Sequence, residues 1–298
     1  MFKKLLLALA LALPLTSNAI LISIDYTYDT NGFFDTGTAD GAAAKARIEN
    51  AASFLSSHID NSWTAIAPGA GINTWTAQFY NPSANTIINR VNDLSIATNT
   101  YVVFVGAYSL GSGVLGQGGA GGMSGSGTAP FIENLQTRGQ PTGFTSWGGS
   151  IAFNNSGTTW HFGETTTGLA GKNDFYSVAL HELTHTLGFG TSSEWDNLIV
   201  GSTFTGADSE AVYGGAVPLS LDLGHWNYGT DSVVFDTVTA QEAAMTPALT
   251  TGTRKLMTTL DMAGLSDLGY NIVPEPNTTI LVGLGLILVI AWRKKSHA

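Results

Sequence analysis

The sequence contains no cysteine among its 298 residues. Disulfide bonds, thiolate metal ligands and a cysteine-based latency switch are therefore excluded. Charged residues are also scarce, at 11% of the chain. The composition is nevertheless that of a folded protein, because 44% of the residues are hydrophobic.

Basic residues are especially scarce between the two ends of the chain. Residues 20–272 contain seven Lys or Arg and 21 Asp or Glu, which gives a net charge near −14. A surface of this sign disfavours nucleic acid and anionic membranes as partners. It is compatible with solubility outside the cell and with bound Ca²⁺ as an additional ion.

The first 19 residues read as a secretory signal peptide. Lys3 and Lys4 precede the apolar run Leu5–Leu15, and Ser17-Asn18-Ala19 ends in the small residue typical of a cleavage site. A membrane anchor is the alternative, but the apolar run is short for a membrane span. Export of a chain without cysteine favours a bacterial secreted protein.

The C-terminal residues 273–298 carry a second, more specific signal. Pro274-Glu275-Pro276 is followed by an apolar run, Ile280–Trp292, and then by Arg293-Lys294-Lys295. This arrangement resembles the PEP-CTERM sorting signal, with its transmembrane segment and basic tail. The resemblance implies transient insertion in the inner membrane, removal of the tail by an exosortase-like enzyme, and a final place at the surface of, or outside, a Gram-negative bacterium. An ordinary single-span tail anchor is the alternative.

Between these ends, hydrophobic periodicity predicts strands and helices in mixed order. Thr100–Ala107 is the most continuous apolar run and is predicted to be a central strand covered on both faces. Gly111–Gly127 is glycine-rich and is predicted to be a solvated surface loop, with a mobile loop over a cleft as the alternative. The other predicted strands are 20–28, 63–66, 74–80 and 148–153, and the predicted helices are 39–58, 173–188 and 259–268.

The stretch Asn173–Gly190, NDFYSVALHELTHTLGFG, contains an H-E-x-x-H motif. Residues i and i+4 lie on one face of a helix, so His181 and His185 can offer their imidazoles to one metal ion, and Zn²⁺ suits such ligands. Glu182 lies beside them and can act as a general base towards the attacking water. Asn173 is the predicted N-cap, and Gly188 is predicted to end the helix.

A catalytic zinc site usually has three protein ligands, and the motif supplies two. His225, within Gly224-His225-Trp226, is the best candidate for the third ligand. His58 is better explained by the helix dipole, and His161 by a structural role. The weaker candidates for a third ligand are Glu194, Asp196 and Glu210.

The segment HELTHTLGFG resembles the zinc helix of the metzincin metallopeptidases, whose pattern is H-E-x-x-H-x-x-G-x-x-H followed by a Met-turn. Thr191 stands where the short pattern has its third histidine. In the leishmanolysin branch the third histidine comes much later, and His225 and Met245 resemble that ligand and the Met-turn. The resemblance implies an α+β fold for residues 20–272: a twisted mixed sheet with a long zinc helix in a lobe of about 20–190, and a smaller irregular lobe of about 191–272 with the Met-turn and final helix.

The segment GGSIAFNNSGTTWHFG resembles the edge-strand region that precedes the zinc helix in matrixins. The resemblance implies that an exposed edge strand binds an extended substrate through Gly149, Ser150, Ile151 and Ala152. Asn154 and Asn155 replace the acidic residues typical of calcium binding there. The function expected from these features is a zinc endopeptidase with a protein or peptide substrate. A non-catalytic surface or biofilm-matrix protein on a peptidase-like scaffold, or a zinc hydrolase of another amide, are the alternatives.

Overall fold

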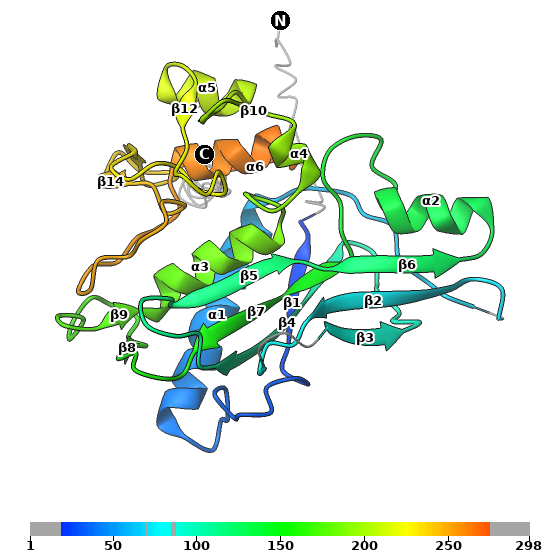
Figure 1. Ribbon diagram of the computed structural model, residues 1–298, viewed down its shortest axis with the longest axis horizontal. Helices are drawn as coiled ribbons and strands as arrows, with labels where there is room; N and C mark the ends of the chain where they lie inside the picture. The colour runs from blue at the N-terminus through cyan, green and yellow to red at the C-terminus, as the bar shows by residue number, and fades with distance from the viewer. Residues whose placement is uncertain (1–18, 70, 85–87, 275–298) are drawn as a thin grey trace, which may run out of the picture.

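The computed structural model describes residues 19–69, 71–84 and 88–274 (Figure 1). The predicted signal peptide up to residue 18 and the apolar segment Ile280–Trp292 lie outside these ranges. Within them the chain forms an α+β fold with six helices and several small sheets. Searching the same ranges finds no helix that has both the length and the apolarity to cross a membrane.

A four-stranded mixed sheet forms the centre of the molecule, in the order β1-β4-β7-β5. The first three strands are parallel, and β5 is antiparallel to β7 at the edge. The central strand expected at Thr100–Ala107 is confirmed, because β4 lies between β1 and β7 and its apolar residues are buried. The four strands are β1 (Leu21–Asp25), β4 (Thr100–Tyr108), β7 (Gly148–Asn154) and β5 (Gly116–Ala120).

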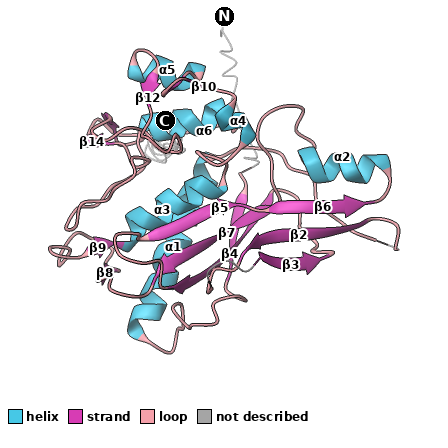
Figure 2. Ribbon diagram, viewed as in Figure 1, coloured by secondary structure: helices cyan, strands magenta, loops and turns pink. Residues whose placement is uncertain are grey.

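Two helices cover one face of this sheet (Figure 2). The helix α1 (Ala39–His58) packs against β1, and α3 (Phe175–Thr186) packs against α1, β5 and β7. The residues between them form a single hydrophobic core. The two long helices expected from the sequence are therefore confirmed. The helix α1 packs against α3, and α3 lies against the edge strand β5.

A second, antiparallel sheet in the order β3-β2-β6 continues beside the first. Its inner face packs Trp75 and Phe79 against Phe104 and Trp147 of the central sheet region. The strand expected at 63–66 is wrong, since this segment makes only one isolated bridge, from Ile66 to Ile96. The elements are β2 (Thr74–Tyr80), β3 (Ile88–Asn92), β6 (Gly122–Ser126) and the neighbouring α2 (Ala129–Thr137).

Two expectations about the sheet edge are wrong. The strand at 148–153 is not an exposed edge, because β7 lies between β4 and β5 and all of its residues are buried. The edge is instead β5, and the glycine-rich stretch 111–127, expected to be a loop, supplies both β5 and β6. Glycine is depleted in strands, so propensity points away from this assignment.

Close packing explains why glycine occupies these strands. A Cβ atom at Gly118 would lie 2.4 Å from the backbone oxygen of Glu182 in α3. A Cβ atom at Gly121 would lie 2.1 Å from the indole of Trp147. Glycine occupies these two positions because α3 and the indole of Trp147 approach the backbone of β5 and of the residue after it. Close backbone approach is one of the recognised uses of glycine in a sheet.

The chain after α3 is irregular, as expected, and shares the hydrophobic core of the first part. Phe189, Trp195 and Trp226 pack against one another in this core, in tilted and edge-to-face arrangements. The final helix α6 (Thr259–Asp267) is confirmed; Thr258 caps it, and Gly269 follows its end. The remaining elements are β8 (Trp160–His161), β9 (Asn173–Asp174), α4 (Ser193–Asp196), β10 (Ile199–Val200), β11 (Thr203–Phe204), α5 (Ala207–Tyr213), β12 (Val217–Pro218), β13 (Asp231–Val233) and β14 (Ala240–Glu242).

The contact between β5 and α3 can be tested with two neighbouring glycines. Gly118→Ala places a methyl group against the backbone of α3 and should lower the free energy of unfolding by about 1–3 kcal/mol. Gly119→Ala is the matched control, because no atom lies within 4 Å of its Cβ position; it should leave stability within about 1 kcal/mol of the parent. Chemical denaturation measures both. Equal effects of the two substitutions would contradict the packing of β5 on α3.

Candidate metal centre

The N-cap of helix α3 lies one residue later than expected. Asp174, rather than Asn173, caps it by accepting a hydrogen bond from the N–H of Ser177 at 3.1 Å. Arg254 pairs with the fully buried Asp174 carboxylate through two hydrogen bonds, of 2.9 and 2.7 Å. At the other end, Gly188 adopts the positive φ of +93° that was expected of it. The cap and the stop fix the length and direction of the helix that carries the motif.

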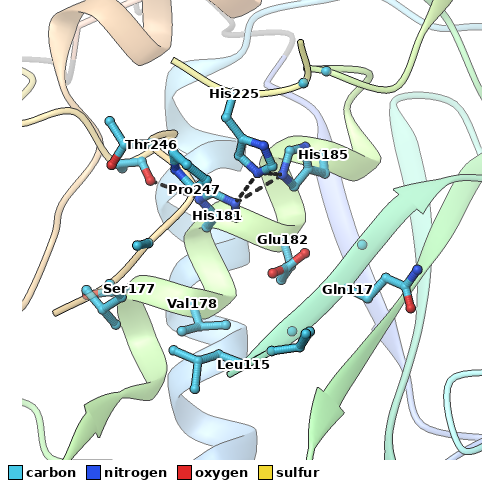
Figure 3. A pocket seen from close by; sticks show the side chains of 18 of the residues that line it. Leu115, Gln117, Ser177, Val178, His181, Glu182, His185, His225, Thr246 and Pro247 are labelled. Atoms are coloured by element: carbon cyan, nitrogen blue, oxygen red, sulfur yellow. Dashed lines mark hydrogen bonds between the residues drawn. The ribbon is translucent and has the colours of Figure 1, made fainter. Parts of the chain in front are cut away.

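The structure brings His181, His185 and His225 together (Figure 3). The first two come from α3, and the third from a loop closed by the bridge between Leu219 and Trp226. The three Nε2 atoms are separated by 3.0 Å (His185 to His181), 3.0 Å (His185 to His225) and 3.2 Å (His181 to His225). Three ring nitrogens from two distant parts of the chain therefore meet at one point.

The opposite ring nitrogens show which tautomer each histidine adopts. Nδ1 of His181 donates to the carbonyl of Ala244 at 2.9 Å, and Nδ1 of His185 donates to the carbonyl of Phe189 at 2.8 Å. Nδ1 of His225 donates to Asp222 at 2.8 Å. Each proton is thus on Nδ1, so all three Nε2 atoms present bare lone pairs to one another.

Burial keeps the two helix imidazoles neutral. Desolvation, together with the other imidazoles, holds the pKa of His181 well below 6.5. Desolvation and His225 lower the pKa of His185 to about 4. A neutral imidazole is the form that binds metal. Three converging lone pairs repel one another unless a cation lies between them, so the arrangement fits a metal ion.

The spacing also fits a small tetrahedral ion. Metal–nitrogen bonds of roughly 2.0–2.1 Å in tetrahedral geometry separate the nitrogens by about 3.3–3.4 Å, close to the separations in the triad. No second group of three or more potential ligands occurs in the described ranges. The alternative third ligands, Glu194, Asp196 and Glu210, do not belong to this group.

Asp222 is part of the site, although the sequence analysis did not single it out. Its carboxylate accepts the Nδ1–H of His225 and also hydrogen bonds from Ser220 and from the N–H of Gly224 at 3.0 Å. Such a carboxylate fixes the orientation and tautomer of a ligating histidine. The signal in the sequence is the D-x-x-H spacing within Leu221-Asp222-Leu223-Gly224-His225.

The segment around Met245 supports the first ligand. The carbonyl of Ala244 accepts a hydrogen bond from Nδ1–H of His181, and the carbonyl of Met245 accepts one from the N–H of Trp226, next to His225. The side chain of Met245 is fully buried in the core. The predicted Met-turn, with Ala244 before it, thus contacts both His181 and the residue next to His225.

Glu182 lies between α3 and the edge strand β5. It is buried, and this burial raises the pKa of its carboxyl to about 8. The N–H of Gly118 donates a hydrogen bond to this carboxylate. The side chain fits because Gly116 has no Cβ, which would lie 2.7 Å from Cγ of Glu182.

A cleft of about 490 Å³ contains the three histidines and Glu182. One wall is the segment 113–118, with Leu115 and Gln117, and the other is the segment 244–249, with Thr246 and Pro247 (Figure 3). The residues expected to bind substrate do not line this cleft, since Gly149, Ser150, Ile151 and Ala152 lie in the interior strand β7. Their expected role is therefore corrected: the strand beside the cleft is β5.

The two other histidines within the described residues have other partners. His161 is buried, with its Nε2 2.8 Å from the carbonyl of Thr165, as expected of a structural residue. His58 ends α1, and its Nδ1 lies 2.7 Å from the carbonyl of Phe54. Neither belongs to the metal-ligand group.

Comparison with known proteins identifies one feature of the chain. Residues 273–295 match the PEP-CTERM protein-sorting motif, which confirms the sorting signal expected there. This motif indicates export and surface sorting in Gram-negative bacteria, and it implies recognition by an exosortase-like processing enzyme. No curated protein and no solved structure is significantly similar to the chain.

The identity of the third ligand can be tested by metal analysis. His225→Ala removes one of three converging imidazoles, so purified protein should lose most of its bound zinc. Glu194→Ala, Asp196→Ala and Glu210→Ala are the matched controls, because these carboxylates lie outside the ligand group. Full zinc content in His225→Ala, with loss in one of the control variants, would reassign the ligand.

The contribution of Asp222 is a separate prediction. Asp222→Ala leaves all three imidazoles in place but removes the acceptor that orients His225, and it should weaken zinc affinity by roughly 10–100-fold. Competition with a chelator of known affinity measures this change. The control is Asp231→Ala, a carboxylate outside the metal-ligand group. Unchanged affinity in Asp222→Ala would mean that the loop alone positions His225.

Proposed function

We propose that the chain is a zinc-dependent endopeptidase with a metzincin-like fold. The observation that carries the proposal is the meeting of three bare imidazole nitrogens with a buried glutamate one residue after the first ligand, all in one cleft. The sequence pattern HELTHTLGFG, the distant His225 and the buried Met245 support the metzincin-like assignment. The sorting motif at residues 273–295 supports action at the cell surface or outside the cell.

The donor set favours zinc over the hard cations. Three neutral imidazoles suit Zn²⁺, whereas Ca²⁺ and Mg²⁺ prefer oxygen ligands. When bound, zinc supplies Lewis acidity that polarises a carbonyl and lowers the pKa of a coordinated water. Three protein ligands leave one position of a tetrahedral site for that chemistry.

Glu182 acts as the general base and then as the general acid. Its carboxylate accepts a proton from the attacking water and afterwards returns it to the leaving amine. Burial raises its pKa to about 8, so the carboxylate is a stronger proton acceptor than an exposed glutamate. The N–H of Gly118 holds the carboxylate in place, and the carbonyl of Ala244 fixes the neighbouring imidazole of His181.

The strand β5 holds the substrate in register with these groups. It is the free edge of the central sheet, and its residues 116–118 line the cleft. An extended peptide can add to such an edge by main-chain hydrogen bonds, with pockets for alternate side chains. The role that the sequence suggested for residues 149–152 thus belongs to β5.

The function can be tested by replacing the base. Glu182→Gln keeps the size of the side chain but removes its ability to accept a proton, so kcat on unmodified peptides should fall by on the order of 10²-fold or more. Zinc content and folding should be close to those of the parent, since Glu182 is not a ligand. The matched control is Gln117→Ala, which changes another side chain of the cleft without touching the proton path.

The outcomes separate the proposed function from its alternatives. Hydrolysis of peptides by Glu182→Gln at the parent rate would contradict the proposed peptidase mechanism. Zinc bound by the parent without cleavage of any peptide would favour a non-catalytic surface protein or a hydrolase of another amide.

A further inference from the structure

We infer that the substrate is a long extended polypeptide, and that its residues before the scissile bond pair with a continuous edge formed by β5 and β6. This inference rests on the proposed function and names its substrate class. It depends on the direction in which the backbone groups of residues 116–125 point.

The two strands form one run of extended chain. The strand β5 ends at Ala120 and β6 begins at Gly122, so a single residue, Gly121, separates them. Each strand is at the edge of its sheet: among the described residues, β5 pairs with β7 alone, and β6 pairs with β2 alone. Figure 1 shows β7 and β2 on the same side of the run, which leaves the opposite side as one long edge.

The hydrogen bonds at the ends of β5 show which of its backbone groups are free. Gly121 donates to Gly148, and Leu115 accepts from Asn154, so these residues point towards β7. Backbone groups of successive residues alternate between the two sides of an antiparallel strand. Gly116, Gly118 and Ala120 therefore point away from β7, to the open edge, where the N–H of Gly118 donates to the Glu182 carboxylate and the groups of Ala120 lie further along the run.

The same reasoning applies to β6. The N–H of Asp93 donates to the carbonyl of Trp75, so Trp75 points towards β3, and its neighbours Thr74 and Thr76 point towards β6. Their partners in register are Ser126 and Ser124. By alternation, the backbone groups of Met123 and Gly125 point to the open edge.

Gly121 keeps the outward-pointing backbone groups of β5 and β6 on the same side of the run. Outward-pointing residues occur at 116, 118 and 120, and then at 123 and 125, so the alternation shifts by one residue at Gly121. An inserted residue of this kind acts as a β-bulge. Only glycine fits there, because a Cβ atom would lie 2.1 Å from Trp147.

The edge extends to one side of the catalytic groups. Glu182 lies against Gly116 and Gly118, at the start of the run, while Gly125 is at its far end. Ten residues of strand span roughly 33 Å. Antiparallel pairing is the more stable arrangement, and it places the residues N-terminal to the scissile bond along β6.

The recognition of this part of the substrate is by its backbone. No charged residue occurs between Gly111 and Gly127, and most of these residues are glycine or serine. Main-chain pairing selects an extended conformation rather than a sequence. The substrates that fit are unfolded or disordered polypeptides of varied sequence.

A nested set of peptides tests the inference. Adding residues on the N-terminal side of the scissile bond should raise kcat/KM by roughly two- to tenfold for each hydrogen bond gained, up to about eight residues. Adding residues beyond the first few on the C-terminal side of the scissile bond should leave kcat/KM nearly unchanged. Equal gains on both sides, or no gain, would overturn the inference.

A matched pair of variants tests the edge directly. Met123→Pro removes one outward N–H, while Met123→Ala loses the same side chain but keeps that N–H. Cleavage of the longest peptide should be about two- to tenfold slower in Met123→Pro than in Met123→Ala, and cleavage of the shortest should be equal. Circular dichroism checks that both variants fold. Replacing the substrate amide that donates to the carbonyl of Met123 by an ester removes the reciprocal hydrogen bond and should give a loss of similar size without altering the protein.

Binding separates this inference from the proposed function. Calorimetry of Glu182→Gln with the same peptides should show affinity rising with N-terminal length, whether or not the parent hydrolyses them. Absence of hydrolysis alone would contradict the proposed peptidase function. Peptide affinities that do not rise with N-terminal length would contradict binding along the β5–β6 edge. A dimer that Met123→Pro dissociates, with peptide affinity unchanged, would assign the edge to a second copy of the chain.

Discussion

The candidate metal centre depends on which ring nitrogen of each of its three histidines carries the proton. Each histidine of the triad commits its Nδ1–H to an acceptor, namely the carbonyls of Ala244 and Phe189 and the carboxylate of Asp222. The three Nε2 lone pairs can then converge only around a cation. Two acceptors come from loops that follow α3 in the sequence, and the third lies four residues after His185. The irregular chain after α3 therefore orients the ligands as well as supplying one.

Asp261 connects that irregular chain to the final helix. Its buried carboxylate accepts hydrogen bonds from the N–H groups of Ala244 and Met245, from the indole of Trp226 and from Thr258. Burial raises the pKa of its carboxyl, whereas these donors lower it. A buried carboxylate is tolerated when its oxygens are satisfied in this way. One side chain in α6 thereby fixes the two segments that hold His181 and His225.

The sequence predicted the parts of the fold that depend on local pattern. The helix around His181 has helical periodicity and the strand 100–107 is a continuous apolar run, and His225 was found because so few histidines were available. The glycine-rich strands and the interior position of β7 were not predicted. The formation of β5 and β6, which makes β7 an interior strand, depends on contacts with α3 and Trp147 that are distant in sequence from both, and glycine carries no periodic signal. Asp222 was missed because an aspartate in a loop has many ordinary roles.

The edge formed by residues 116–125 is of a kind that proteins usually protect. Exposed edges invite pairing with other chains, and charges, proline or a covering element normally block them. This edge has no charge and no proline. The acidic residues lie elsewhere in the chain, where a net charge near −14 opposes self-association. An open edge retained beside the cleft, in a chain whose other surfaces repel one another, is consistent with use by a bound polypeptide.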